Sequence, residues 1–286
     1  MKIEILGSGG AVTTPKPFCK CSVCVTARKG TAIDSRFGPS VFIHGPDLLI
    51  DTPEEIFVQL NRSSVTTMKA CTYSHWHPDH TSGKRIFEMN KDWIGFPPKH
   101  RNTDVYLTEK VLETFDQFLG IKGHFDFLSH SELISLKVIG NSESFTIDQY
   151  QVKPIQLNQD YSFGFEVHGD GKRILIIMDE LKFWEPSSEV LNWKYDLVYL
   201  PLGIVDVNPI TKKRNINENH SILKDEQTIG ETLEYVGRIS ADRFLLYHVE
   251  EPDEISYKMG IELGKYCSMT SGKNVEIAFD TQIVEI

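Results

Sequence analysis

The stretch "TYSHWHPDHTSG", residues 72–83, concentrates metal-competent side chains in one short loop. Within six residues it contains His75, His77, Asp79 and His80. Imidazole nitrogen and carboxylate oxygen together suit zinc, manganese or iron. A single histidine here would be read as a solvated loop residue beside a helix N-cap. Four such groups directly after an apolar, strand-like segment favour a metal site.

Composition and charge restrict the class of protein. The chain has 286 residues, of which 40% are apolar, and a formal net charge of −10. This excess of acidic residues argues against a broad surface that binds nucleic acid, because such a surface needs lysine and arginine in excess. A small anionic substrate remains compatible, because a bound metal inverts the local charge. No sequence feature indicates the oligomeric state, so we expect a homodimer, the commonest oligomer, by default.

The beginning of the chain and its cysteines indicate the compartment. "MKIEILGSGG" lacks the apolar core of a signal peptide, and no apolar run approaches the length of a membrane span. Three of the five cysteines lie within six residues, a spacing that suits a metal better than disulfides. We therefore expect a cytoplasmic protein without a membrane partner.

Strand-like and helix-like segments alternate along the whole chain. Strands are expected at residues 2–6, 69–73 and 105–108, in a hairpin around Pro46 and Asp47, and in several later segments that end with "ILIIMD", "DLVYLPLG" and "RFLLYH". Helices are expected at residues 83–94, 109–119, 225–236 and 253–266. The simplest reading is one α/β domain over residues 1–286, with a cysteine-rich insertion at about 12–38.

The motif "HWHPDH" resembles the H-x-H-x-D-H motif of the metallo-β-lactamase-fold hydrolases. The resemblance implies an αββα sandwich of two mixed sheets flanked by helices, with the metal site at one edge. It assigns His75 and His77 to a first metal, and Asp79 and His80 to a second. In this reading Asp79 is also catalytic, because it orients the attacking water.

Later ligands of the family follow in the same order. "RILIIMD" supplies Asp179 as the bridging aspartate, and "RFLLYH" supplies His248 as the last histidine. The family also expects a histidine between the motif and the bridging aspartate, where this chain has Gln159 followed by Asp160. Asp160 could replace it only if the loop shifts. The resemblance thus implies either two divalent metals, manganese or zinc, with the first held weakly, or a mononuclear centre.

The segment "GSGGAVTTPKPFCKCSVC" resembles the branch that contains the phosphodiesterase of the carbon–phosphorus lyase pathway. In that branch three cysteines and a histidine hold a structural zinc, and the matching cysteines are Cys19, Cys21 and Cys24. The position of the fourth ligand is occupied here by Glu251. Other candidates for it are His44, Cys71 and Cys267. The alternative to a zinc site is three reduced thiols without a metal, although clustered exposed thiols are prone to oxidation.

"NENHSIL" resembles the loop of the same branch in which a histidine faces the substrate. His220 would then protonate the leaving group or hydrogen-bond the phosphate. Alternatively, this segment has only a structural role as the N-cap region of a helix, with Asn219 or Ser221 as the cap. Two segments, 91–104 and 203–215, are expected to line the pocket.

The leading functional hypothesis is a metal-dependent phosphodiesterase that acts on a small phosphodiester, including cyclic ones. One alternative is a mononuclear redox enzyme of the pyrroloquinoline quinone biosynthesis type, which shares the cysteine loop. Another is a non-catalytic relative that retains only the structural zinc. The cysteine loop disfavours a β-lactam substrate, and the acidic charge disfavours transfer-RNA processing.

Overall fold

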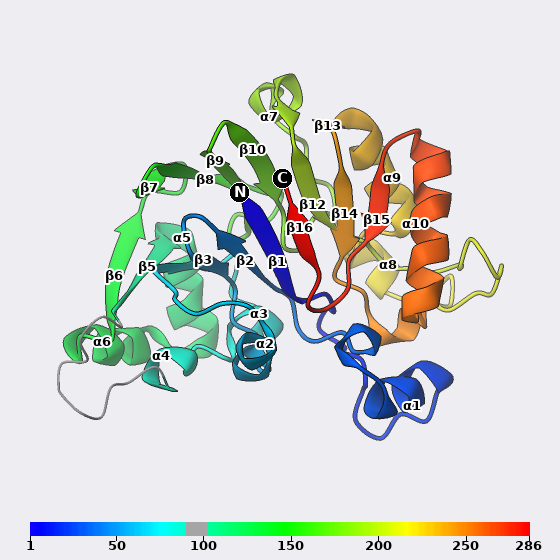
Figure 1. Ribbon diagram of the computed structural model, residues 1–286, viewed down its shortest axis with the longest axis horizontal. Helices are drawn as coiled ribbons and strands as arrows, with labels where there is room; N and C mark the ends of the chain where they lie inside the picture. Colours follow the sequence, from blue (N-terminus) through cyan, green and yellow to red (C-terminus); the bar gives the residue numbers. More distant parts are fainter. Residues whose placement is uncertain (90–101) are drawn as a thin grey trace.

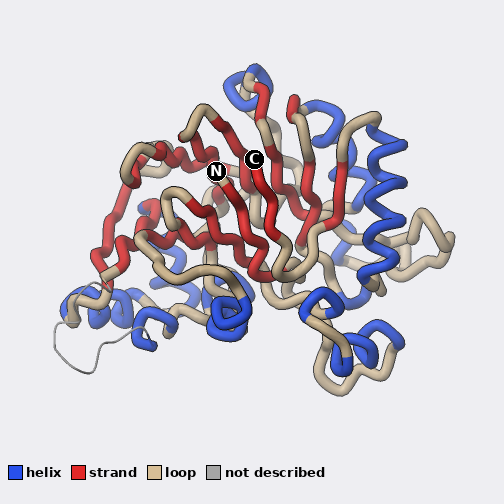
Figure 2. Tube along the Cα trace, in the orientation of Figure 1, coloured by secondary structure: helices blue, strands red, loops and turns tan. Residues whose placement is uncertain are grey.

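The computed structural model describes residues 1–89 and 102–286. Two seven-stranded mixed sheets lie at the centre, and helices cover their outer sides (Figures 1 and 2). The predicted fold class is therefore confirmed. Most of the predicted pocket-lining segment 91–104, and the end of the helix predicted for 83–94, lie outside the described residues.

The first sheet is built from the N-terminal half of the chain and the last strand. Its order is β16 (Ile283–Glu285), β1 (Lys2–Gly7), β2 (Ser40–His44), β3 (Leu48–Ile50), β4 (Ala70–Thr72), β5 (Thr103–Thr108) and β6 (Ile134–Ile139). The strands from β16 to β3 pair antiparallel, whereas β3 to β6 are parallel. Two strands predicted from the sequence, β1 and β4, thus meet in one sheet.

The second sheet carries the rest of the chain. Its order is β15 (Val275–Ile277), β14 (Phe244–Tyr247), β12 (Leu197–Pro201), β10 (Lys172–Ile176), β9 (Phe163–Gly169), β8 (Tyr150–Gln156) and β7 (Phe145–Ile147). Strands β10, β12, β14 and β15 are parallel, and the other pairs are antiparallel. A separate two-stranded ribbon joins β11 (Lys194–Tyr195) and β13 (Ser240–Ala241).

Helices connect and cover these strands. They are α1 (Ser22–Lys29), α2 (Ile56–Arg62), α3 (Pro78–Thr81), α4 (Ile86–Met89), α5 (Glu109–Thr114), α6 (Lys122–His130), α7 (Ser188–Asn192), α8 (Ile222–Asp225), α9 (Ile229–Arg238) and α10 (Tyr257–Ser271). Two short 3₁₀ helices, η1 (Ala32–Asp34) and η3 (Glu251–Asp253), and one π-helical turn, η2 (Phe115–Leu119), complete the set within the described residues. The helix predicted for 225–236 begins later, because a capping box of Thr228 and Glu231 sets its start. No helix among the described residues is long and apolar enough to cross a membrane.

Strand β10 shows how the layers are held together. Successive side chains of a strand point to opposite faces of its sheet. Ile174 and Ile176 therefore join the core between the two sheets, where they meet Ile3 and Ile5 of β1. Leu175 joins a second core on the other face, beneath α9 and α10. Full burial of each such side chain is worth about 1.5–3 kcal/mol, so both faces of β10 fix its position in the sandwich.

Candidate metal centre

One edge of the sandwich collects most of the predicted site residues. The loop after β4 carries the motif from His75 to His80, and Asp179 and His248 follow β10 and β14. Because β10 and β14 both run parallel to β12, their carboxyl ends reach the same edge. Side chains that lie far apart in the sequence thereby meet at one place.

The first group of possible metal ligands contains four residues. They are His75, His77, Asp179 and Glu180, whose ligand atoms lie within 4.8 Å of one another. His77 Nδ1 lies 3.4 Å from a carboxylate oxygen of Glu180. Two imidazoles and two carboxylates are a ligand set that suits zinc, manganese or iron.

The second group contains Asp79, His80 and His248. The Oδ2 atom of Asp79 lies 3.3 Å from His80 Nε2 and 3.7 Å from His248 Nε2. Asp179 Oδ2 is 3.9 Å from His80 Nε2 and 3.5 Å from His248 Nε2. Asp179 thus belongs to the first group and touches the second, which is the position expected of a bridging carboxylate.

Three imidazole nitrogens in this centre have no hydrogen-bond partner among the residues that the structure describes. They are the Nε2 atoms of His75, His80 and His248, and all three are buried. Leaving a buried polar atom unpaired costs about 1–3 kcal/mol. Three such atoms beside acidic side chains are explained if their lone pairs are ligands. The residues present therefore fit divalent metal ions.

A buried carboxylate behind the centre orients His80. Asp51 follows β3 directly, and its Oδ2 lies 2.7 Å from His80 Nδ1. Ser74 donates to Asp51 from its backbone nitrogen at 2.7 Å and from its hydroxyl at 2.6 Å. A carboxylate only accepts, so His80 carries its proton on Nδ1 and turns the Nε2 lone pair toward the centre. Sequence reasoning missed Asp51, although it ends the strand-like segment "LLIDT".

The charges and burial at the centre shift the pKa values of two of its carboxylates in opposite directions. Burial alone would raise the pKa of Asp79, but His80 and His248 hold that pKa well below its usual range. Burial and the neighbouring Asp179 raise the pKa of Glu180 to about 8. A cation placed between these groups would favour the ionised form of Glu180.

Gln159 and Asp160 do not reach the centre. Both side chains are exposed, and Asp160 pairs with Lys110 at 3.2 Å. The loop shift that would bring Asp160 into the site is therefore absent. Glu180 instead supplies a fourth donor to the first group, and it follows Asp179 directly in the chain. No spacing pattern in the sequence pointed to it.

Three residues of this edge have a backbone conformation that is rare outside glycine. The φ angles are 62° at Asp51, 59° at Glu180 and 58° at His248. Such left-handed residues cost of the order of 1–3 kcal/mol each and persist only where the surrounding structure holds them. At these three positions the surrounding structure therefore holds a turn from which the side chain reaches the centre.

The cysteine loop forms a separate cluster. Cys19, Cys21 and Cys24 place their sulfur atoms 2.9, 3.3 and 3.3 Å from Oε1 of Glu251. A tetrahedral zinc site separates its ligand atoms by about 3.6 Å, given zinc–ligand bonds of about 2.0–2.3 Å. The four donors therefore fit a zinc ion. Lys16 pairs with the other oxygen of Glu251 at 2.6 Å.

Local structure explains why the three sulfurs converge. Cys21 is the N-cap of α1, an unpredicted helix inside the loop that projects from the sandwich (Figure 1). Backbone N–H groups of Lys16, Cys21 and Cys24 point at the sulfurs of Cys24, Cys19 and Cys21, at 3.3–3.4 Å. The other candidates for the fourth ligand lie elsewhere: His44 pairs with Glu4, and Cys71 and Cys267 are buried in the two cores.

A cavity of about 420 Å³ opens onto the metal centre. His77, Asp79, Asp179 and His248 line one part of it, and the predicted His220 lines another. His220 Nδ1 accepts a hydrogen bond from Ile222 N at 3.1 Å. The neutral ring must then carry its proton on Nε2, which makes it a donor.

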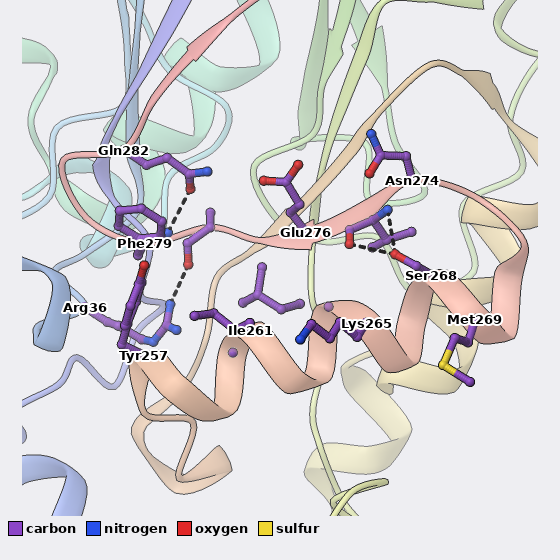
Figure 3. A pocket seen from close by; sticks show the side chains of 15 residues that line it. Arg36, Tyr257, Ile261, Lys265, Ser268, Met269, Asn274, Glu276, Phe279 and Gln282 are labelled. Atoms are coloured by element: carbon purple, nitrogen blue, oxygen red, sulfur yellow. Dashed lines mark hydrogen bonds between the residues drawn. The ribbon is translucent and has the colours of Figure 1, made fainter.

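A larger cavity of about 630 Å³ lies between α10 and β15, away from the metal centre (Figure 3). Arg36 reaches into it and donates to the carbonyl of Ala278 at 2.8 Å. No histidine or cysteine of the described chain lines it. The chemistry therefore belongs to the smaller cavity.

Two packed mixed sheets with this ligand-rich edge define the metallo-β-lactamase fold. Several solved structures share this fold over nearly the whole chain. No protein-family model and no curated protein sequence matches the chain.

Zn²⁺-bound PqqB from Methylobacterium extorquens superposes with a TM-score of 0.70 at 15% identity and full coverage of both chains. A diphosphatase of the PhnP family gives 0.69 at 16% identity, covering 100% of this chain and 97% of its own. The metallo-β-lactamase-fold protein YhfI from Bacillus subtilis gives 0.65 at 13% identity, covering 99% of each. At these identities the similarity establishes the fold.

Proposed function

We propose that this protein is a metal-dependent hydrolase with two divalent ions, manganese or zinc, and that it cleaves a small phosphodiester. The observation that carries the proposal is the convergence of three unpartnered imidazole nitrogens with three carboxylates at the mouth of a cavity. The fold is shared with a diphosphatase of the PhnP family, which supports phosphorus chemistry as the first choice.

The ligand roles follow from the two groups. His75, His77, Asp179 and Glu180 would hold one ion, and Asp79, His80 and His248 the other, with Asp179 shared. When bound, the ions supply Lewis acidity toward phosphoryl oxygens and lower the pKa of a water. Asp79 would have a second role, because its other oxygen can accept a hydrogen bond from the attacking water and orient it.

His220 supplies the proton-donating side of the reaction. Its ring lines the cavity, and Nδ1 accepts from the backbone nitrogen of Ile222, which leaves the proton of the neutral ring on Nε2. That N–H would donate to a phosphoryl oxygen or to the leaving alkoxide. General acid catalysis of this kind contributes about 10²–10⁴-fold.

The cysteine cluster has a structural role in this proposal. A zinc ion held by Cys19, Cys21, Cys24 and Glu251 would tie the segment 12–38 to η3. Glu250, next to Glu251, accepts from the backbone nitrogens of Ala11 and Val12 at 3.0 and 2.7 Å. Ala11 and Val12 line the cavity, so the cluster anchors one of its walls.

The test combines metal content with turnover. Protein purified without chelators should contain about one zinc and two further divalent ions per chain, and should hydrolyse bis(4-nitrophenyl) phosphate. His80→Ala and Asp179→Ala should lose both the two ions and the activity. A fully loaded protein that cleaves no phosphodiester would contradict the proposal.

The second candidate is a redox or oxygen-using enzyme with iron at the same centre. Glu180 favours it, because it makes the ligand set richer in carboxylate, and carboxylate with imidazole is a ligand set that suits iron. Retention of iron during purification, together with full metal loading and no esterase activity, would move the assignment to this candidate.

A further inference from the structure

The cavity beside the metal centre contains acceptors that no step of the proposed hydrolysis uses. Apart from the possible metal ligands, its charged lining residues are Glu226, Glu250 and Asp253. No lysine or arginine of the described chain lines it. The rest of the wall is largely apolar, through Val12, Ile204, Ile216, Ile222, Pro201 and Pro252.

Two of these three carboxylates are occupied by the protein itself. Glu250 accepts from the backbone nitrogens of Ala11 and Val12. Asp253 accepts from the backbone nitrogens of Val205 at 2.9 Å and Glu250 at 3.0 Å. These bonds hold the loops that form the cavity, so both side chains have a structural explanation.

Glu226 differs from them. Within the described ranges its carboxylate makes neither a hydrogen bond nor an ion pair, and the residue is half-buried at the end of α8. A half-buried carboxylate to which the protein offers no donor can accept a hydrogen bond from a ligand without losing an existing protein contact. Its position in the cavity wall makes it available to a bound molecule.

The neighbouring Gln227 gives an independent indication of the same ligand. The residue is only 2% exposed and lines the same cavity, and within residues 1–89 and 102–286 its Oε1 has no hydrogen-bond partner. Its backbone is fixed, because the carbonyl accepts from Ile204 N at 2.8 Å. Like the carboxylate of Glu226, this buried amide oxygen can accept a hydrogen bond from a bound ligand.

We propose that Glu226 and Gln227 bind a protonated amine, and that the substrate is a phosphodiester whose alcohol carries an ammonium group. An ammonium has three donors and no acceptor, which matches the carboxylate of Glu226 and the amide oxygen of Gln227. The negative charge of Glu226 selects the cation over a neutral hydroxyl. The phosphate would face the metal centre and His220, while the ammonium lies at Glu226. This inference rests on the proposed hydrolysis for the identity of the scissile group.

The experiment compares two esters of nearly equal shape, 2-aminoethyl 4-nitrophenyl phosphate and propyl 4-nitrophenyl phosphate, at pH 8. The metal-loaded wild type should prefer the aminoethyl ester in kcat/KM by about tenfold or more, as expected for one hydrogen-bonded charge. Glu226→Gln, which keeps the shape but not the charge, should bring that ratio close to one. Metal content and circular dichroism check that the variant is folded and loaded.

Asp225→Asn is the matched control. It removes the same charge from the adjacent residue, whose side chain is exposed and does not line the cavity. Its selectivity ratio should equal that of the wild type. A wild-type ratio near one, or a Glu226→Gln ratio equal to that of the wild type, would overturn the assignment of an ammonium site.

Calorimetric binding separates this inference from the proposed function. Binding of 2-aminoethyl phosphate and propyl phosphate to the metal-loaded protein needs no turnover. If neither ester is cleaved, the phosphodiesterase proposal fails, and the binding ratio still decides the ammonium site. Equal affinities for the two phosphates would reject it, whereas a preference for the amine that Glu226→Gln removes would support it.

Discussion

Replacing Asp51 by asparagine tests whether the centre depends on the orientation of His80. The change is almost isosteric and lies behind the possible ligands rather than among them. Asp51 accepts from Ser74 N, Ser74 Oγ and His80 Nδ1, all within 2.6–2.7 Å. An amide has one acceptor oxygen and one NH₂ group, so it cannot satisfy all three donors.

Either orientation of the new amide leaves a poor contact. If its NH₂ group faces His80, it donates to Nδ1, and the ring proton moves to Nε2, which blocks the lone pair that faces the centre. If the NH₂ group faces the backbone of Ser74, two donors oppose each other. Outer partners of metal-binding histidines are typically worth about 10–100-fold in metal affinity. We therefore expect a loss of about 1.4–2.8 kcal/mol in binding free energy.

Manganese is the appropriate probe, because carboxylates and imidazoles bind it while the thiolates of the cysteine cluster favour softer metals. Titration of metal-free wild type and Asp51→Asn, followed by the paramagnetic signal of free manganese, gives both dissociation constants. Affinities within twofold of each other would refute the role of Asp51.

Asp196→Asn is the control for the loss of a carboxylate in general. Asp196 accepts from Lys172 Nζ at 2.8 Å and from Arg173 N at 2.9 Å. It directly precedes β12 and so lies at the opposite end of the parallel strands from the metal centre. This variant should lose thermal stability and keep the manganese affinity of the wild type.

Four other changes test the remaining assignments. Glu180→Gln should lower the content of active-site metal by about one equivalent per chain by atomic spectroscopy, because the first group loses an anionic ligand; unchanged content would exclude Glu180 as a ligand. His220→Ala should reduce kcat by about 100-fold with full metal content, and metal loss in this variant would contradict its role as a donor. Cys24→Ser should release zinc and expose residues 12–38 to proteolysis while manganese binding persists. In metal-free protein, burial acts to raise the pKa of Glu251, yet bonds from Cys19 and Lys16 lower it from 4.5 to about 2. The stabilisation is therefore complete above pH 4.5 and lost as the pH falls toward 2, which hydrogen exchange of α1 should show; Glu251→Gln should lack this pH dependence.

Local patterns accounted for much of the fold. Strands β1, β4 and β14 lie where their composition predicted them, because a buried strand must be apolar on both faces and end in turn residues. The helix α1 was missed inside the cysteine loop. Its N-cap is Cys21. Cysteine is not among the residues that usually cap helices, so in this motif it indicated a metal ligand and not the start of a helix.

The candidate centre shows where sequence reasoning stops. His75, His77, Asp79 and His80 were readable as a unit, because they share one loop. Asp179 and His248 were predicted from the family resemblance, through their order after strands, and the structure brings both to the same edge. Gln159, which occupies the position expected for the family's remaining histidine, does not replace it as a ligand, because its side chain is exposed to solvent.

The sequence by itself determined the alternation of strands and helices, the histidine motif and the cysteine cluster, because each depends on neighbouring residues or on the apolar pattern of single strands. The sandwich itself was expected only from the resemblance that the histidine motif carries. Only the tertiary structure decided that Glu180 joins the first ligand group, that Asp51 orients His80 and that Glu251 completes the cysteines. These contacts are set by strand order, parallel registers and left-handed backbone turns at Asp51 and Glu180. Such distances depend on how the two sheets pack, and no local spacing records them.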